Sequence, residues 1–332
     1  MKFEEITEAM NALLKQCGHR QERVALAAQE QFAKALMSPL REGVFAGDII
    51  QGVFEEVRFA PGAAPEFPLD MVAPGTEKDY VAYTIPSQGR IPERNVEGDF
   101  VMVPTYDVGA SIDWLLKYSR DARWDIVARA MQILESTFVK KRNDDGVHTL
   151  LTAAVDRNIV VFDGDAAQGQ FTKRLVSVMK TVMRRNGGGN SSSIRRGKLT
   201  DLWISPEANE GMRTWGVDQV DEVTRREIYT AGDGSLNRVF NVNLHDIDEF
   251  GEGQEYQLYF SNDLGGSLAS GDVELVLGLD LQNNDSFLNP VREDIQVFED
   301  PTFHRQRRQG VYAWREYGFA ALDNRRVILG SL

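Results

Sequence analysis

Apolar residues recur at helical spacing through the first 42 residues of the chain. They follow one another in steps of three and four, broken around Gly18, and the pattern stops at Ser38-Pro39. The stripe consists of Ile6, Met10, Leu13, Cys17, Val24, Ala28, Phe32 and Leu36. This pattern predicts an amphipathic helix with one buried face, ended by the proline. Because spacing does not tell what covers that face, the helix either packs on its own core or forms an arm on a neighbouring subunit.

The helical spacing of apolar residues does not continue into residues 54–75. Residues 54–75 contain four prolines, which block a helix and a central strand and predict extended or looped chain. Two strand-like runs follow, Asp79–Ile85 and Asp99–Tyr106, separated by the polar, turn-rich stretch 86–98. We predict a long two-stranded excursion. Such a ribbon has little apolar face to bury, so it must lie on its own domain or across an adjacent copy.

The longest regular pattern predicts a helix that acts as a spine. Its apolar positions are Trp124, Val127, Met131, Leu134 and Phe138. Ser119 is available as its cap, and the basic run 140–142 suits its carboxyl end. We predict roughly 22 residues of helix, about 33 Å long. We expect the polar stretch 143–146 to stop it, and a second helical run to follow over Val147–Val155.

From about residue 157 to 277 the pattern alternates between helix and strand. A helix is predicted over 171–185, with Leu175, Val178, Met179 and Val182 on one face. A second helix starts at Ser205-Pro206, which supplies a cap and a first-turn proline. Strands are predicted at 199–204, 238–244, 256–260 and 273–279.

The C-terminal stretch 291–332 reads as strands. Ile295–Phe298 is one run, and after Gly310 apolar residues predominate on both alternating faces, which is typical of a strand buried on two sides. A last strand this apolar is expected to return to an earlier core. The sequence therefore predicts a discontinuous domain wrapped around a continuous central one.

Two loops of opposite charge stand out. Residues 184–198 hold five basic residues and no acid, whereas residues 244–255 hold five acids and no Lys or Arg. The acidic loop does not fit a calcium loop, since the fifth and twelfth ligand positions counted from Asp246 are Phe250 and Gln257. The basic loop could touch phosphate, but it lacks interleaved aromatic residues for base stacking.

Loops of opposite charge on identical copies can instead meet head to tail around a ring. The candidates for such contacts are Arg195 and Arg196 on one side and Asp246, Asp248 and Glu249 on the other. We expect charge reversal of the two arginines to impair assembly without unfolding the monomer.

Composition narrows the function. The 332 residues carry 37 basic and 50 acidic side chains, a net charge of −13, which argues against a surface that grips nucleic acid throughout. No stretch approaches 18 uninterrupted apolar residues, and the acidic N-terminus is unlike a signal peptide, so we expect a soluble, intracellularly made chain. The single cysteine, Cys17, excludes an internal disulfide framework and a Cys-based zinc site.

Catalytic motifs are absent from the sequence. The Gly197-Lys198 step is followed by Leu199, and position 192 is serine, so a phosphate-binding loop is rejected. Two clusters keep a metal-dependent hydrolase open as an alternative: Asp144, Asp145 and His148, and His245 with Asp246 and Asp248. Each needs further ligands brought in by folding.

The order of these parts resembles the major capsid protein of tailed bacteriophages. The run RRQGVYAWREYGFAALDNRRVIL at 307–329 is similar to the closing strands of that family, and LTDLWISPEANEGMR at 199–213 is similar to its central strand and Ser-Pro-started helix. The resemblance implies an α+β fold with a discontinuous peripheral domain. Its expected parts are a helical N-terminal arm (1–53), an extended loop (54–110), a peripheral domain with the spine helix (111–156), an axial domain (157–277) and a return to the peripheral domain (278–332).

The resemblance also implies a function. It indicates a non-enzymatic subunit of an icosahedral head, assembling into hexamers and pentamers in the host cytoplasm and enclosing double-stranded DNA without sequence-specific binding. It implies no cofactor, no metal and no membrane, and separate scaffolding, portal and decoration proteins as partners. Lys78, Arg90 and Arg94, in the excursion, are further candidates for contacts between subunits. Some relatives cross-link Lys to Asn, but no partner Asn is assigned for Lys78. A bacterial nanocompartment shell protein of the same extended family is the alternative.

Overall fold

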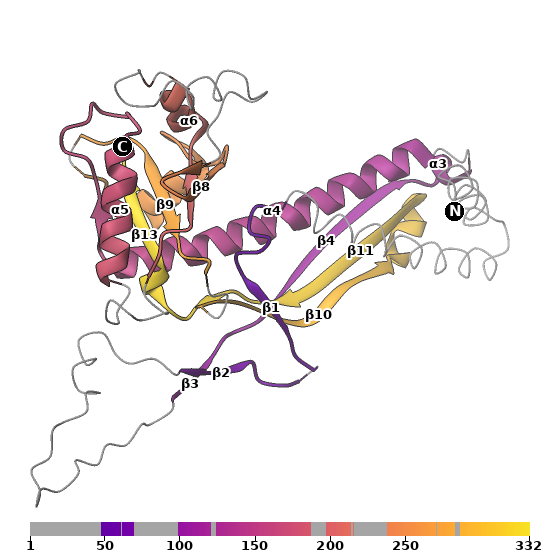
Figure 1. Cartoon of the computed structure of the whole chain (residues 1–332). Coiled ribbons are helices and arrows are strands. Elements are labelled where there is room, and N and C mark those ends of the chain that lie inside the picture. Colours follow the sequence, from indigo (N-terminus) through magenta and orange to yellow (C-terminus); the bar gives the residue numbers. More distant parts are fainter. Residues whose placement is uncertain are drawn as a thin grey trace, which may run out of the picture. The chain divides into compact units, whose positions relative to one another are not determined.

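The computed structural model describes the chain in nine stretches (Figure 1). These are residues 48–60, 62–69, 99–120, 124–186, 197–213, 215, 238–269, 271–282 and 286–332. The described residues form two compact units. Unit 1 comprises the described residues within Met1–Glu66, Met102–Gly146 and Asn289–Phe319, and unit 2 those within Phe67–Val101, Val147–Leu288 and Ala320–Leu332. The predicted N-terminal helix and the strand-like run Asp79–Ile85 lie outside the described residues.

Unit 1 is built on an antiparallel sheet with the strand order β1-β10-β11-β4. Its strands are β1 (Glu55–Arg58), β10 (Phe287–Glu299), β11 (Arg308–Tyr317) and β4 (Tyr106–Leu115). The pairing of β11 with β4 is continuous over ten residues, from Arg308 opposite Leu115 to Tyr317 opposite Tyr106. A 3-10 helix, η4 (Pro301–Gln306), lies between β10 and β11 in the chain, and the short helix α3 (Leu116–Arg120) follows β4.

The spine helix is one unbroken element, α4 (Trp124–Asp156), of 33 residues and about 50 Å. The predicted stop at 143–146 is wrong. Gly146 lies inside the helix where Ile50 packs closely against it: a Cβ there would lie 2.7 Å from the Ile50 Cδ1 atom, so the glycine serves packing. The Asp145 carboxylate also has partners in this helical conformation. Lys141 lies 2.7 Å from it one turn earlier in the helix, and the Tyr317 hydroxyl of β11 donates to it at 3.1 Å. The polar run that ends in this glycine is therefore not a helix stop here.

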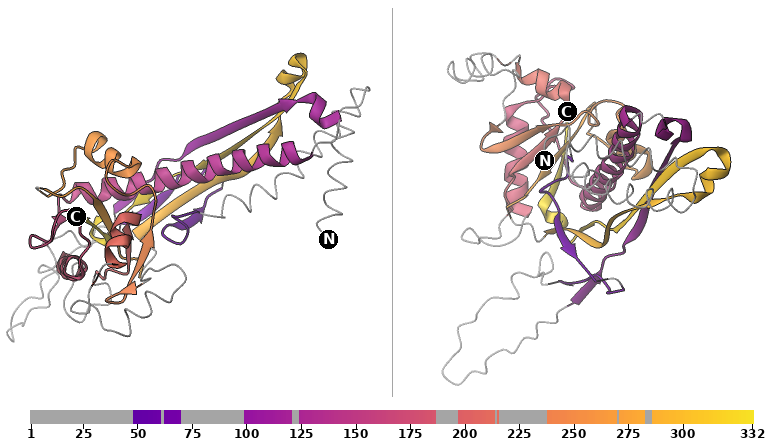
Figure 2. Two further views of the ribbon diagram at one scale, coloured as in Figure 1. Left: turned by 90° about the horizontal axis from the view of Figure 1, so that it is seen from above. Right: turned by 90° about the vertical axis from the view of Figure 1, so that its right-hand side faces the viewer.

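The part of α4 in unit 1 runs along one face of this sheet (Figures 1 and 2). Met131, Leu134 and Phe138 form its buried stripe, as the spacing predicted. Burial along β11 alternates accordingly. Val311, Ala313, Arg315 and Tyr317 are buried, whereas the residues between them are exposed or half-buried. The prediction of a strand buried on both sides is therefore wrong for β11, because only one face of its sheet is covered within the described chain.

Unit 2 is built on a six-stranded mixed sheet with the order β5-β13-β9-β6-β8-β7. The strands are β5 (Val160–Val161), β13 (Val327–Ser331), β9 (Leu275–Leu279), β6 (Asp201–Ile204), β8 (Val242–Asp246) and β7 (Arg238–Val239). β13 pairs in parallel with β5, and β6 in parallel with β8, while the other pairs are antiparallel. The two-residue strand β12 (Ala320–Ala321) pairs with the start of β10, and η5 (Asn324–Arg326) precedes β13. The last strand therefore returns to the core of unit 2, whereas 289–319 belongs to unit 1.

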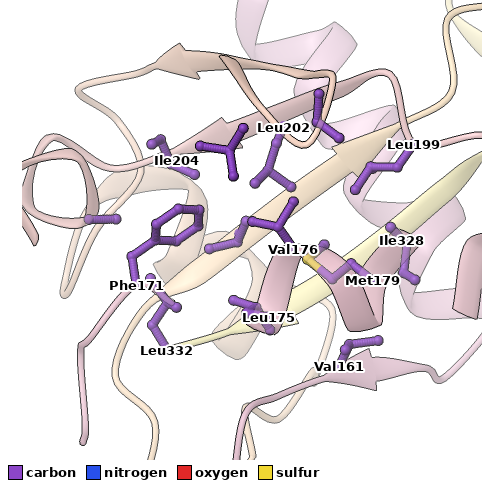
Figure 3. Close-up of a cluster of buried hydrophobic side chains, with 14 of the residues drawn as sticks. Val161, Phe171, Leu175, Val176, Met179, Leu199, Leu202, Ile204, Ile328 and Leu332 are labelled. Atoms are coloured by element: carbon purple, nitrogen blue, oxygen red, sulfur yellow. The ribbon is translucent and has the colours of Figure 1, made fainter. Parts of the chain in front are cut away.

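The core of unit 2 lies between this sheet and helix α5 (Lys173–Asn186), whose apolar side chains point at the strands (Figure 3). Leu175 and Met179, predicted for the buried face, are fully buried. Val178 and Val182 are partly buried and pack against the same cluster. The helix buries Val176 and Met183 as well, so its apolar face is wider than the predicted one.

One local prediction holds and two fail. Helix α6 (Pro206–Arg213) begins as predicted, with the amide of Ala208 donating to the Ser205 hydroxyl at 3.0 Å. The predicted strand 238–244 is a hairpin of β7 and β8 around a two-residue turn. The predicted strand 256–260 is the helix α8 (Glu255–Leu258) continued by a π-helix, η2 (Tyr259–Asp263). Tyr256 and Phe260 are both buried, and a spacing of four places them on one helical face.

The excursion is a two-stranded sheet where the structure describes it. β2 (Glu66–Leu69) pairs with β3 (Asp99–Met102). Phe100 and Met102 of β3 are each 66% exposed. Two large apolar side chains on a lone pair of strands remain uncovered by the described chain.

Tight packing under the sheet of unit 2 gives a first test. A Cβ at Gly278, in β9, would lie 2.6 Å from Leu199 Cδ1 and 2.7 Å from Ile328 Cγ2. We expect Gly278→Ala to lower the free energy of unfolding by about 1–3 kcal/mol through overpacking, measured by urea denaturation. The matched control is Gly164→Ala, where the nearest atom would lie at an ordinary 3.7 Å. Equal effects of the two substitutions would contradict this packing.

Candidate assembly surfaces

The structure places three of the eight predicted contact residues. Asp246, Asp248 and Glu249 lie in unit 2, at and just beyond the end of β8. Lys78, Arg90, Arg94, Arg195 and Arg196 lie outside the described residues.

The acidic residues gather where β8 ends. β6 and β8 are parallel, so both end at the same edge of the sheet, and α6 starts there directly after Ser205. Asn209 of α6 donates to the Asp246 carboxylate at 3.1 Å, while Asp248 is exposed. We call the acids that follow β8 the acidic end; its members are Asp246, Asp248, Glu249, Glu252 and Glu255.

A buried carboxyl group lies beside the acidic end. Glu274 is 6% exposed, and the Ser205 hydroxyl donates to it at 2.5 Å. Burial raises the pKa of Glu274; the Ser205 hydrogen bond opposes this shift, and the nearby Glu207 and Glu252 add to it. Glu274 therefore keeps its proton to a higher pH than an ordinary glutamate.

The two proposed histidine sites are not metal centres in the described chain. The Nε2 atom of His245 lies 2.9 Å from Asp201 Oδ1, and the Asn243 amide donates to the same oxygen at 3.0 Å. Burial favours a raised pKa of Asp201, but these hydrogen bonds outweigh it, so the pKa is lowered. His148 stacks on Tyr259 with ring centroids 3.7 Å apart. Among the described residues, no group of three or more His, Cys, Asp or Glu side chains is placed to hold a metal ion.

Basic charge lies on the outer side of α5. The helix carries Lys173, Arg174, Lys180, Arg184 and Arg185 and no acid. Arg174 pairs with Asp165 and lies 3.5 Å from Asp163, and the Lys180 ammonium donates to the Phe240 carbonyl at 2.6 Å. The sequence reading placed the basic charge from residue 184 onward and missed its beginning. Five basic residues and no acid in 14 positions are the signal that shows it.

The uncovered face of the unit 1 sheet carries an aromatic row that the sequence reading also missed. Phe298 of β10 lies opposite Tyr312 of β11 with ring centroids 5.4 Å apart, and Trp314 is 6.4 Å from Phe298. Opposite Tyr312 and Trp314, β4 offers only Ser111 and Gly109. Phe298 and Tyr312 are exposed, so the row forms an apolar surface. The alternation of aromatic residues at 312 and 314 is the signal for it.

The covered side of the unit 1 sheet holds buried charges. Arg142 of α4 lies 2.8 Å from Asp48, and both side chains are almost completely buried. Burial raises the pKa of Asp48, against the effect of Arg142. Arg315 of β11 is 2% exposed and lies 3.8 Å from Glu56 and 4.0 Å from Asp294. Removing one partner would leave a buried charge uncompensated, so these ions tie β1, α4 and the central strands to one arrangement.

Two of the three comparisons with known proteins find no match: no family model matches the chain, and no curated protein matches it in sequence. In the described parts of the chain, no helix is both long and apolar enough to cross a bilayer.

Solved structures of similar fold cover most of the chain. A chain from Microbacterium phage Oxtober96 is similar over 86% of this chain and 91% of its own, with a TM-score of 0.59 at 11% identity. The capsid of Myoviridae phage XM1 gives a TM-score of 0.53 at 11% identity, covering 86% of this chain and 92% of that one. The mature capsid of bacteriophage PhiM1 gives 0.53 at 11% identity, over 87% and 88%. The chain therefore has the bacteriophage capsid shell fold, a mixed α and β architecture with a long spine helix.

The buried Glu274 makes the stability of the chain depend on pH. Because the folded-state pKa of this carboxyl is raised, its contribution to stability is present at low pH and is lost as pH rises through that pKa. Glu274→Gln keeps an acceptor for Ser205 and removes the ionisation. We expect the variant to lose less stability than the unsubstituted protein between pH 5 and pH 8, measured by urea denaturation. Glu210→Gln, on the exposed side of α6, is the control; an identical pH dependence in all three proteins would contradict this account.

Proposed function

We propose that the chain is a structural subunit of an icosahedral bacteriophage head that self-assembles into hexamers and pentamers. The observation that carries the proposal is the shell fold, which is shared over 86% of the chain with the capsid of Myoviridae phage XM1 and over 87% with the mature capsid of bacteriophage PhiM1, covering 92% and 88% of those chains. By this proposal the chain functions in the virion, is assembled in the host cytoplasm and encloses double-stranded DNA.

The uncovered surfaces support an assembling role. The β3 residues Phe100 and Met102 are mostly exposed, and the aromatic row of Phe298, Tyr312 and Trp314 lies on the sheet face that α4 does not cover, so both leave apolar area at the surface. Burying such area between copies supplies about 25 cal/mol per Å² before the costs of association. Unit 1 corresponds in this proposal to the peripheral domain, unit 2 to the axial domain, and the ribbon lies over an adjacent copy.

The distribution of charged residues supports contacts between neighbouring copies around each hexamer or pentamer. The acidic end of one copy faces the basic segment that contains Arg195 and Arg196 on the next, in a head-to-tail arrangement. Individually weak interfaces suffice, because many contacts per subunit act together once the shell closes. A net charge of −13 lets packed DNA move instead of being held tightly. Scaffolding, portal and decoration proteins are separate partners in this proposal.

Electron microscopy tests the proposed function. We expect the full chain, expressed alone or with the other head proteins of its genome, to give symmetric capsomers or closed particles in negative stain. DNA-filled particles support a phage head, whereas closed shells that recruit peptide-tagged protein cargo support a nanocompartment. A strictly monomeric chain at high concentration, even with scaffold supplied, would contradict both.

Charge reversal tests the head-to-tail contact. We expect Arg195→Glu with Arg196→Glu to reduce particle yield by about tenfold or more while leaving the unfolding transition of the monomer unchanged. The control reverses Lys117 and Lys140, two exposed basic residues of unit 1, and changes the net charge equally. Normal assembly of the Arg195/Arg196 variant would overturn the proposed contact.

A further inference from the structure

The hairpin of β7 and β8 ends in an exposed phenylalanine held in an unfavourable backbone conformation. Phe240 has φ +48° and Asn241 has φ +66°. Two successive residues with positive φ make a type I′ turn, for which Asn, Asp and Gly are strongly preferred. A bulky residue at the first position is an outlier. The Phe240 side chain is nevertheless 53% exposed, so its ring is not kept there by burial in its own unit.

Neighbouring side chains hold the turn in place. Lys180 of α5 donates to the Phe240 carbonyl at 2.6 Å, and the Arg238 guanidinium donates to Asn243 across the hairpin at 3.1 Å. The pairing of Arg238 with Asn243 and of Val239 with Val242 closes a two-residue loop. The ring is thus presented on a supported turn, which lowers the entropy cost of a contact made by it.

Positive charge surrounds this tip. Arg238 precedes it, Lys180 touches its backbone, and Arg184 lies one helical turn beyond Lys180 on the same side of α5. An aromatic anchor with a charged rim is the composition expected at the centre of a protein interface. We call Phe240 with Lys180, Arg184, Arg185 and Arg238 the basic tip.

The opposite end of β8 has the complementary character. β8 leaves the turn at Val242 and reaches the acidic end at Asp246, a rise of about 13 Å. Beyond the acids, Leu258 of α8 is 47% exposed, one turn after Glu255. Unit 2 therefore carries an apolar side chain in a basic setting at one end of a strand and an apolar side chain in an acidic setting beyond the other.

We propose that the basic tip of one copy docks on the acidic end of a second copy of this chain, with Phe240 packing on the surface that presents Leu258. This interface rests on the proposed shell function and deepens it by naming the anchor of the contact within a ring. The two surfaces differ, so the contact is heterologous, and repetition closes a ring when the rotation per copy fits. Like ends repel each other, which disfavours head-to-head pairs.

The first test separates assembly from folding. Asn suits positive φ, so we expect Phe240→Asn to raise the Tm of the monomer by about 2–4 °C while weakening association by about tenfold or more. A residue with a merely structural role would move both readouts in the same direction. The control is Phe162→Asn, which removes a phenylalanine of unit 2 that is 54% exposed and lies outside both surfaces. Differential scanning calorimetry and sedimentation velocity give the two readouts.

A charge exchange tests the choice of partner surface. We expect Arg184→Glu with Arg185→Glu to block capsomer formation, and Glu252→Lys with Glu255→Lys to block it too. The chain that carries all four substitutions restores complementary ends and is expected to recover at least about half of the wild-type capsomer yield.

The outcomes distinguish this interface from the proposed function. Wild-type particles together with normal assembly of Phe240→Asn, or with no recovery in the fourfold variant, would overturn the interface and leave the shell function standing. A wild-type chain that never associates would overturn both. Three results together support the interface. Phe240→Asn associates more weakly and has a raised Tm, Phe162→Asn associates like the wild-type chain, and the fourfold charge exchange recovers capsomer yield.

Discussion

Apolar surface that the described part of the chain leaves exposed is the constraint on which this account depends. The two strands β2 and β3 have no partner sheet among the described residues, and β3 exposes Phe100 and Met102. The unit 1 sheet is covered by α4 on one face, and its other face carries Phe298, Tyr312 and Trp314. Isolated exposed apolar residues are ordinary, but contiguous ones on open elements indicate an interaction surface.

The two units place their charged side chains differently. Unit 1 buries charges beneath its sheet, where Arg142 pairs with Asp48 and Arg315 lies near Glu56 and Asp294. Such ions add little net stability compared with apolar residues, but they penalise any other register of the surrounding elements. Unit 2 has an apolar core between α5 and its sheet, buries Glu274 and the ion pair of Arg326 with Asp280 away from that core, and carries opposite surface charge near the two ends of β8. Because the two ends of β8 carry opposite surface charge, unit 2 presents two unlike surfaces, which a head-to-tail ring of identical copies requires.

Sequence reasoning located the elements whose signal is periodic or local. The buried stripe of α4, the face of α5 around Met179 and the Ser205 cap of α6 follow from spacing and cap chemistry. It failed where a tertiary contact decides. Gly146 lies within the helix and makes room for Ile50 instead of ending it, and the aromatic residues at 256 and 260 form a helical face instead of a strand.

The candidate surfaces were predicted only in part. Asp246, Asp248 and Glu249 stand out as charge in the sequence, whereas the exposure of Phe240 and the hydrogen bond that Lys180 makes to it depend on a hairpin that sequence patterns read as one strand. The prolines between 54 and 75 correctly indicated chain without a helix or a central strand where the structure describes it, but they concealed two four-residue strands, the edge strand β1 and the strand β2. No periodic signal reports what covers an exposed side chain, since that depends on molecules outside the chain.

A cryo-electron microscopy map of the assembled particle at side-chain resolution tests the central claim most directly. The account predicts that Phe240 is buried against residues 246–258 of the adjacent copy, and that the aromatic row of the unit 1 sheet and the β3 residues Phe100 and Met102 are covered by neighbouring molecules. A particle in which these side chains face solvent, or a chain that gives no particle and stays monomeric, would contradict it.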